Sequence, residues 1–415
     1  MRKRPKTRHK HPGIVAGSIL TISLSLLSVA ALLTVNSGVL ATMSSFITGG
    51  ESPVPEISDI PDISDTNPAE PHTGESEPSA DEPPFEQDIV FAKPSQLKGV
   101  WLKAGADYYL KESDSGEAVR AQIDAAFEKI AEWGFNTVVV PVSVGGKMLF
   151  PYNDGQEIVI KDHDGSRFDP LYYILERARD RGVFTYGVID LMVNSEGGPD
   201  PSTPDGADAI RDMASRAVEH CPFDGWLIEN PGYAFGTAGS FAEYMKTMPG
   251  GGFERFLKDS VTSVVIDVIK IIKKQSVNLY IGLLADGGWA HSTSDERGSQ
   301  TSSVYESLTD GFADTRGWLI DGLFDFVMVK NPYSTEDKAA PFGKVVEWWA
   351  KLCKEISIPM YVAHDSAKVG SGEAGWKSPD QLARQVLACK NRQEWSGSAF
   401  TSFTALKNDT SGSTS

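Results

Sequence analysis

Four acidic residues stand where strand-like segments of the sequence end. Glu229 closes the segment GWLIE and Asp190 closes VFTYGVID, while Asp286 and Asp365 end two further apolar runs. Breaking a glycosidic bond requires two carboxyl groups on either side of it. One donates a proton, and the other acts as nucleophile or activates water. These four side chains are therefore the candidates for catalysis of glycoside hydrolysis.

Glu229 is the first candidate for the proton donor, because it follows the apolar residues GWLI and low polarity favours a protonated carboxyl group. Asp365 or Asp190 would be its partner, with Asp286 next. A Glu229–Asp365 pair would place the acids on the fourth and seventh strands. For each acid the alternative is a structural role, in which it accepts backbone N–H groups of nearby loops or forms a salt bridge.

Aromatic and polar side chains near the same segment ends are candidates for sugar binding. Sugar rings present C–H faces that pack on aromatic rings, and amide or imidazole groups can hydrogen-bond hydroxyl groups. The alternative for each is packing in the core. The candidate substrate-binding residues are Trp101, Tyr186, Asn230, Tyr233, Trp289, Asn331, Tyr333 and His364. No His or Cys pair has metal-ligand spacing, so neither a metal nor another cofactor is expected.

These residues lie on a repeating pattern of strands and helices. Eight β-branched or aromatic runs alternate with seven helical patterns, which predicts an α/β fold of the (β/α)8 TIM-barrel type. A doubly wound open sheet is the alternative, but the glycine fingerprint after its first strand is missing. The predicted strands are 99–104, 136–142, 183–190, 225–230, 278–285, 324–330, 359–365 and 398–404. The predicted helices lie near 117–133, 169–181, 206–220, 253–275, 301–321, 338–357 and 378–392.

The strand ends of a TIM barrel share one face, and catalytic groups lie there. The four acids are therefore expected to point into one site. No eighth helical pattern follows the last predicted strand, because the tail KNDTSGSTS is polar and rich in Ser and Thr.

The N-terminal part has the composition of a membrane anchor and a spacer. A basic tail at 1–12 precedes an uncharged apolar run at 13–43, which exceeds the roughly 20 residues of a spanning helix. The acidic, Pro-rich segment 44–94 predicts a disordered linker. A TIM barrel at 95–406 and a flexible tail at 407–415 would follow. The positive charge before the apolar run predicts a single-pass protein of the cell membrane with a cytoplasmic N-terminus and an extracytoplasmic domain. A cleaved signal peptide is the alternative.

Several motifs follow one another in an order that resembles a known family. They are KGVWLK (98–103), WGFNTVVVPV (133–142), FDPLYYILERARDRG (168–182), FDGWLIEN (223–230), FADTRGWLIDGLFDFV (312–327), VVEWWA (345–350) and the trio Trp376, Pro379 and Gln385. Segment 98–406 resembles the glycosyl-hydrolase-like 10 family of TIM-barrel, glycosidase-like domains. That resemblance implies a glycosidase, and the bacterial members include enzymes directed at peptidoglycan.

The polar positions at the strand ends depart from the family pattern. The family has Gln and Arg after strand 2, paired aspartates after strand 4, Ser-Pro on strand 5 and Gln near the end of strand 6. The corresponding residues here are Pro141, Ser143, Glu229, Asn230, Leu284, Ala285, and Lys330 or Asn331. Either the substrate and the acid pair have changed, or catalysis has been lost.

The formal net charge of −17 disfavours nucleic acid as a partner and is compatible with a neutral glycan. We therefore expect a glycoside hydrolase that acts on cell-wall or other extracellular glycan. The chief alternative is a catalytically inactive glycan-binding or cell-envelope scaffold protein. A third possibility is another barrel activity, such as a lyase or a deacetylase.

Overall fold

The fold is known from a computed structural model, which describes most of the chain beyond the N-terminal segment. The described residues are 93–152, 155–191, 198–229, 238–302 and 304–408. The expected anchor at 13–43, nearly all of the expected linker and the last seven residues lie outside this set. Within the described ranges, no helix combines the length and the apolar character needed to cross a membrane.

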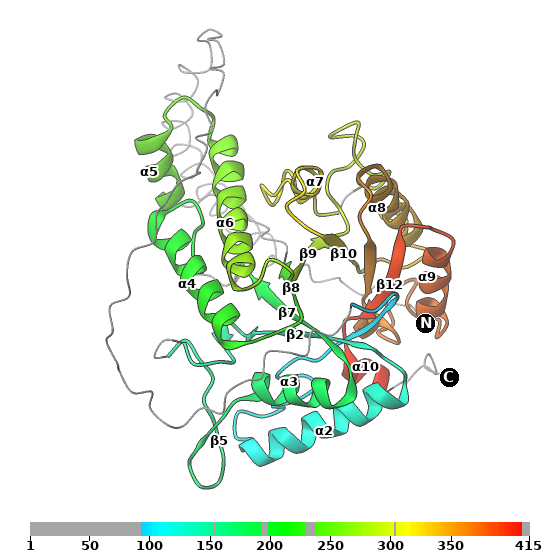
Figure 1. The fold of residues 1–415 in the computed structure, drawn as a ribbon. Coiled ribbons are helices and arrows are strands. Elements are labelled where there is room, and N and C mark those ends of the chain that lie inside the picture. The colour runs from blue at the N-terminus through cyan, green and yellow to red at the C-terminus, as the bar shows by residue number, and fades with distance from the viewer. Residues whose placement is uncertain (1–92, 153–154, 192–197, 230–237, 303, 409–415) are drawn as a thin grey trace, which may run out of the picture. The chain divides into compact units, whose positions relative to one another are not determined.

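Eight parallel strands close into a barrel, which confirms the predicted (β/α)8 architecture (Figure 1). The strands follow one another round the barrel in the order β1-β2-β7-β8-β9-β10-β11-β12, and β12 pairs with β1. They are β1 (Leu97–Trp101), β2 (Thr137–Pro141), β7 (Phe184–Asp190), β8 (Gly225–Glu229), β9 (Tyr280–Asp286), β10 (Phe326–Asn331), β11 (Met360–His364) and β12 (Trp395–Phe400).

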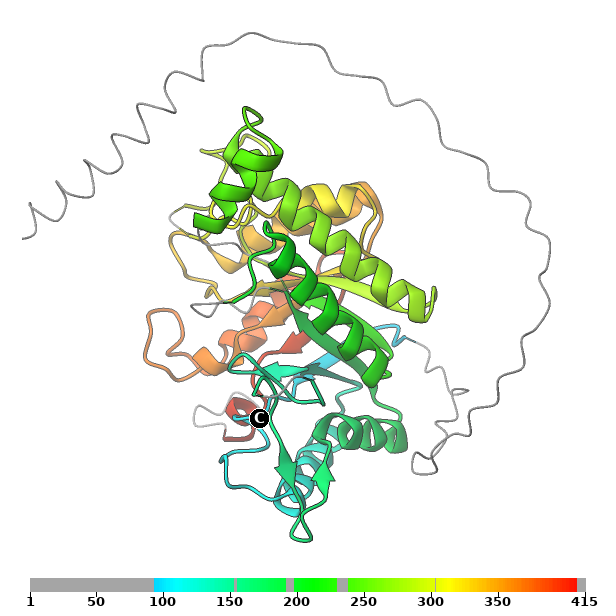
Figure 2. The same cartoon turned by 90° about the vertical axis from the view of Figure 1, so that its left-hand side faces the viewer.

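Helices surround the barrel, and two short hairpins lie between β2 and the helix Pro170–Arg181. The helices are α2 (Gly116–Glu132), α3 (Pro170–Arg181), α4 (Pro204–His220), α5 (Ala238–Thr247), α6 (Phe253–Gln275), α7 (Thr315–Ile320), α8 (Phe342–Ile356), α9 (Gln381–Lys390) and α10 (Phe403–Asn408). The hairpins are β3 (Ser143–Val144) with β4 (Lys147–Met148), and β5 (Ile160–Lys161) with β6 (Arg167–Phe168). Figure 2 shows α4 and α6 side by side on the outside of the strands.

Local sequence signals explain where several helices begin and end. The side chains of Ser115, Asp169 and Thr203 accept backbone N–H groups of the first turns of α2, α3 and α4. Gly134 and Gly182 follow α2 and α3 with φ of 69° and 65°, a conformation that glycine adopts without strain.

Three predicted elements differ from the structure. Most of the predicted helix near 301–321 is a loop, and only α7 is helical there. The loop is held by carboxylates, since Glu306 accepts the hydroxyl of Thr309 at 2.9 Å and Asp314 accepts the indole N–H of Trp289 at 2.8 Å. Helix α5 was not predicted. The end of the last predicted strand, 398–404, begins the short helix α10 instead.

The outer face of β12 and β1 is covered less completely than the rest of the barrel, because α10 has only six residues. A cavity of about 500 Å³ lies there, lined in part by Trp133, Phe135, Trp395 and Phe400. We call these four residues the side groove. Its polar lining comes from the starts of β1 and β12 and the end of α9.

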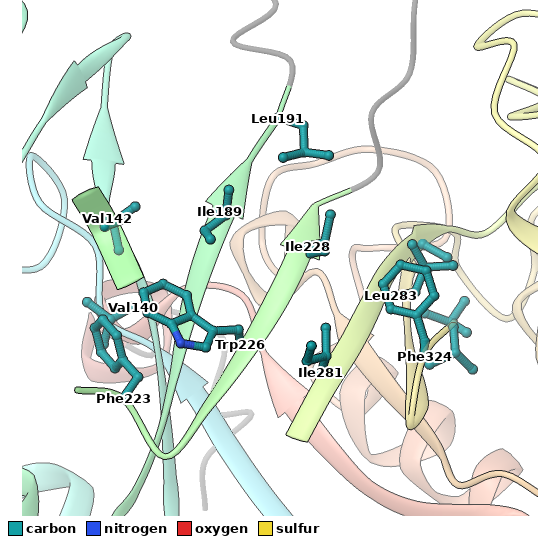
Figure 3. Packing of buried hydrophobic residues seen from close by; sticks show 14 of the residues in the cluster. Val140, Val142, Ile189, Leu191, Phe223, Trp226, Ile228, Ile281, Leu283 and Phe324 are labelled. Atoms are coloured by element: carbon teal, nitrogen blue, oxygen red, sulfur yellow. The ribbon is translucent and has the colours of Figure 1, made fainter. Parts of the chain in front are cut away.

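Two apolar layers hold the barrel together. Side chains that alternate along each strand point either to the helices or into the barrel. Figure 3 shows part of the outer layer, where Val140, Ile189, Trp226, Ile228 and Ile281 pack beneath the helices. The inner layer consists of Leu97, Trp101, Val139, Phe184, Tyr186, Val188, Leu227, Leu284, Phe326, Met328, Tyr361, Ala363 and Ala399.

Candidate active site

The inner apolar layer fixes which polar residues face the mouth of the barrel. Leu227, Leu284 and Met328 point inward, so the residues two positions later in the same strands also point inward. The same argument applies to β1, β7 and β11. The inward residues at the C-terminal strand ends are Lys103, Asp190, Glu229, Asp286, Lys330 and Asp365. We call these six residues the rim site, and all four acids predicted from the sequence belong to it.

Lys330 connects two of these acids. Its ammonium nitrogen lies 2.9 Å from Oε1 of Glu229 and 3.1 Å from Oδ1 of Asp286. Burial by itself lowers the pKa of Lys330, but the two carboxylates outweigh it and raise that pKa above its usual value. Lys330 is therefore a permanent cation that forms an ion pair with each of the two carboxyl groups.

Lys103 is a second, partly buried cation in the rim site. Burial lowers its pKa, against the opposing charges of Asp107, Glu229 and Asp365. Asp107 has a structural role, because it accepts the backbone N–H of Lys103 at 2.8 Å and the hydroxyl of Thr404 at 2.7 Å. Glu229 and Asp365, from β8 and from the residue after β11, therefore both act on one ammonium group.

The remaining two acids differ in their neighbours. Asp190 pairs in register with Glu229, so these two acids stand side by side on β7 and β8. Asp365 stands three strands from Glu229 in the barrel order. Its carboxylate accepts the hydroxyl of Thr401 at 3.4 Å. The rim site thus contains three acids on the neighbouring strands β7, β8 and β9, and a fourth, Asp365, on another part of the rim.

The surroundings of Glu229 differ from the apolar ones that its sequence suggested. Trp226 points to the outer face of the barrel, where its ring packs against Phe223 at a centroid distance of 5.1 Å (Figure 3). A charged group, the Lys330 ammonium, instead lies within hydrogen-bond distance of Glu229. The proposed reason for a protonated Glu229 is therefore not found in the structure.

Two tyrosines lie close to Asp286. Burial, Asp286 and Asp337 raise the pKa of Tyr333 to about 12. Burial and Asp286 likewise raise the pKa of Tyr305, which is 37% exposed. Both phenols are neutral hydrogen-bond donors beside the rim site. Tyr333 was predicted to bind substrate, whereas Tyr305 fell in a segment that was predicted to be helical.

Several other predicted substrate-binding residues are buried away from the rim. Trp101 belongs to the inner layer directly below Lys103, and it is only 4% exposed. Tyr186 lies deeper in the barrel, against Phe184 and Phe326. The ring of Trp289 stacks on Trp348 in the outer packing. Asn230 and Tyr233 lie outside the described residues.

Asn331 and His364 point to the outer face because each neighbours an inward residue. The amide of Asn331 donates to the carbonyl of Phe342 at 3.2 Å and so anchors the start of α8. His364 is fully buried, and its ring nitrogens contact Gln385 Oε1 at 2.9 Å and Ser398 Oγ at 2.7 Å. The structure places both residues in packing and loop support, away from the rim.

The buried His364 predicts a specific pH dependence of stability. Burial lowers its pKa to about 4, although the Gln385 contact opposes that shift, and the usual value is 6.5. Between these values the unfolded chain binds more protons, so stability is complete above pH 6.5 and falls as the pH drops toward 4. The full loss is on the order of 3 kcal/mol. We expect His364→Gln to flatten this slope in urea unfolding measured from pH 7 to pH 4. If the free energy of unfolding falls with pH equally steeply in the variant and the wild type, the expectation is contradicted.

Within the described residues, no group of three or more His, Cys, Asp or Glu side chains is arranged to hold a metal ion. The rim site offers carboxylates, ammonium groups and phenols. These groups can transfer protons, stabilise a positive charge that develops on a sugar ring, and hydrogen-bond hydroxyl groups.

A TIM barrel whose inward strand ends carry several carboxyl groups is the architecture and chemistry of a glycoside hydrolase. No protein-family model matches the chain. Its sequence is 21% identical over 339 residues to the glycosyl hydrolase YngK of Bacillus subtilis, over 72% of this chain and 66% of that protein. It is 22% identical over 332 residues to the glycosyl hydrolase DigH of Escherichia coli, over 66% of this chain and 74% of that protein.

Among solved structures, the glycoside hydrolase domain of PgaB (BpsB) from Bordetella bronchiseptica shares the fold. The TM-score is 0.51 at 12% identity, over 76% of this chain and 96% of that chain. The chain thus spans about two thirds of the B. subtilis relative and resembles proteins named as glycosyl hydrolases. These relatives support the assignment of an enzyme of the glycoside hydrolase class.

Proposed function

We propose that this chain hydrolyses glycosidic bonds in an extracytoplasmic glycan, such as that of the cell wall, with Glu229 and Asp365 as its carboxyl pair. The observation that carries the proposal is the rim site. Both carboxyl groups face the mouth of the barrel from separate strand ends, and both act on the ammonium group of Lys103. A carboxyl pair on two sides of one opening is the arrangement that glycoside hydrolysis needs.

The extracytoplasmic placement is part of the proposal. It rests on the apolar run at 13–43 that follows the basic tail at 1–12. A single-pass anchor would hold the barrel on the outer side of the membrane, close to its glycan. The names of the two bacterial relatives support glycoside hydrolysis, and the resemblance to the glycosyl-hydrolase-like 10 family makes peptidoglycan the first substrate to test.

A catalytically inactive glycan-binding protein is the second candidate, and one observation favours it. Lys330 or Asn331 stands where the family pattern has Gln, and Lys330 forms ion pairs with Glu229 and Asp286. Such pairs could neutralise the site instead of preparing it for catalysis. Binding without turnover would distinguish this function from hydrolysis.

The test is turnover by the full chain in detergent micelles on purified peptidoglycan, chitin, cellulose and xylan. New reducing ends are labelled by borodeuteride reduction and identified by mass spectrometry. We expect labelled fragments from at least one glycan, in amounts that grow with time and enzyme concentration. If the chain co-sediments with a glycan but releases no labelled fragments from any of the four glycans, the hydrolase proposal is rejected in favour of a glycan-binding protein.

A further inference from the structure

We infer that Lys330 is a positioning residue that holds the Glu229 carboxyl group through a charge-assisted hydrogen bond, and that Asp365 donates the proton to the leaving sugar. This inference rests on the proposed function and assigns the two roles within the carboxyl pair. It reverses the expectation from the sequence, in which Glu229 is the donor.

The first step of the argument is the contact between Lys330 and Glu229. The distance of 2.9 Å is that of a charge-assisted hydrogen bond. The two side chains are only 28% and 32% exposed, so solvent screens this pair less than it would screen a surface ion pair. Lys330 therefore fixes the position of the Glu229 carboxyl group beside the mouth of the barrel.

The second step concerns the other charged or titratable groups near this pair among the described residues. Asp286 on β9 shares Lys330 at 3.1 Å, and Tyr305 lies beside both of them. Lys103 from β1 acts on Glu229 as a second cation. Asp190 is a like charge next to Glu229 on β7. Lys330 and Lys103 attract the Glu229 carboxyl group, whereas Asp190 and Asp286 repel it. Asp286 also forms an ion pair with Lys330.

The third step is the contrast with Asp365. Among the described residues, the hydrogen bond to its carboxylate comes from the neutral hydroxyl of Thr401, at the long distance of 3.4 Å. Its cationic neighbour is Lys103, whose charge interacts more strongly with Asp107 and with Glu229. Among the described residues, Glu229 is thus the member of the pair that a cation holds by a hydrogen bond, whereas the carboxyl group of Asp365 contacts a neutral hydroxyl.

These roles give a complete hydrolysis. The proton of Asp365 passes to the glycosidic oxygen as its bond to the anomeric carbon breaks, and the leaving sugar departs as an alcohol. The anomeric carbon then bonds either to a Glu229 oxygen or to a water molecule whose proton Glu229 accepts. In the first case, water later releases the sugar and returns its proton to Asp365.

Leaving-group dependence tests the two roles. A 2,4-dinitrophenyl glycoside of the sugar released in the glycan panel needs no proton donor, because its phenolate is a good leaving group. We expect Asp365→Asn to keep a kcat/KM near that of the wild type on this glycoside, because kcat/KM reports the step in which the leaving group departs, and to lose turnover of the glycan. Glu229→Gln should lose both activities. The reverse pattern, in which Glu229→Gln retains the aryl glycoside activity, would overturn the assignment.

Lys330 is tested by variants that remove or keep its charge. Without the cation the Glu229 carboxylate is less stable, so a higher pH is needed to ionise it. We expect Lys330→Met to move the acid limb of kcat/KM upward by about one pH unit or more, and Lys330→Arg to restore its position. The matched control is Lys273→Met, which removes an ion pair with Asp325 at 3.2 Å near the start of β9. An unchanged acid limb in Lys330→Met would contradict the positioning role.

A measurement that needs no activity separates this inference from the proposed function. The pairing of residues 229 and 330 is read from urea unfolding midpoints of Lys330→Met, Glu229→Gln and the double variant at pH 7. We expect the midpoint of the double variant to differ from the sum of the two single shifts, because each single change leaves a partner unpaired. Additive shifts would overturn the coupling. Coupling without turnover by the wild type would instead reject the hydrolase and the donor role of Asp365, while leaving the pairing intact.

Discussion

Glu229→Gln is expected to lower kcat/KM on the cleaved glycan by about 10²- to 10⁴-fold, the range usual for a residue that acts directly on the reacting bond. Gln retains the size of the side chain and can still accept a hydrogen bond from Lys330. It cannot carry the negative charge that stabilises the developing positive charge on the sugar or that activates water. The loss should therefore fall on the chemical step, and we expect KM to change much less than kcat.

The control for this variant is Glu347→Gln on the exposed side of α8. Glu347 pairs with Lys344 at 3.4 Å and is 56% exposed. We expect this change to leave both activity and stability near those of the wild type. Thermal unfolding of all three proteins checks that the barrel remains folded. Equal turnover by the wild type and Glu229→Gln would remove Glu229 from the mechanism.

The second large effect concerns the inner layer of the barrel, where Gly282 and Phe326 depend on each other. A methyl group added at Gly282 would lie 2.1 Å from the ring of Phe326 and 2.8 Å from Leu227. Phe326 is fully buried between Tyr186 and Tyr361. We expect Phe326→Ala to cost about 3–5 kcal/mol through the cavity that it leaves. Gly282→Ala should cost about 1–3 kcal/mol through overpacking.

The two changes should not be additive, because the added methyl occupies space that the ring vacates. We expect the double variant to be more stable than the sum of the single losses predicts, as measured by urea unfolding at pH 7. Gly343→Ala in α8 is the matched control, since nothing lies within 4 Å of the added methyl group. Additive losses at Gly282 and Phe326 would show that the barrel interior relaxes around both changes.

The sequence predicts the barrel well because strands buried on both faces read as short apolar runs between polar loops. All eight predicted strands overlap observed ones, and the acids that follow them reach the rim site. The helix predicted near 301–321 is wrong for most of its length, because carboxylates such as Glu306 and Asp314 form hydrogen bonds that organise a loop there. Their tertiary hydrogen bonds carry no periodic signal.

The substrate-binding residues were harder to predict for a related reason. A strand that is apolar on both faces does not show which of its residues point inward. His364 and Asn331 each neighbour an inward residue, Asp365 or Lys330. Because side chains alternate along a strand, they point to the opposite face. Lys103 was not among the predicted site residues, and Lys330 was noted only as a departure from the family pattern. A prediction that considers only acidic residues misses the lysines that form ion pairs with them.

The most direct test of the central claim is a crystal structure of Glu229→Gln with a short oligosaccharide of the glycan that the wild type cleaves. The account predicts that a glycosidic oxygen lies between residue 229 and the carboxyl group of Asp365, with a sugar ring close to Tyr305 or Tyr333. An oligosaccharide bound in the side groove by Trp133 and Trp395, with the rim site empty, would contradict it.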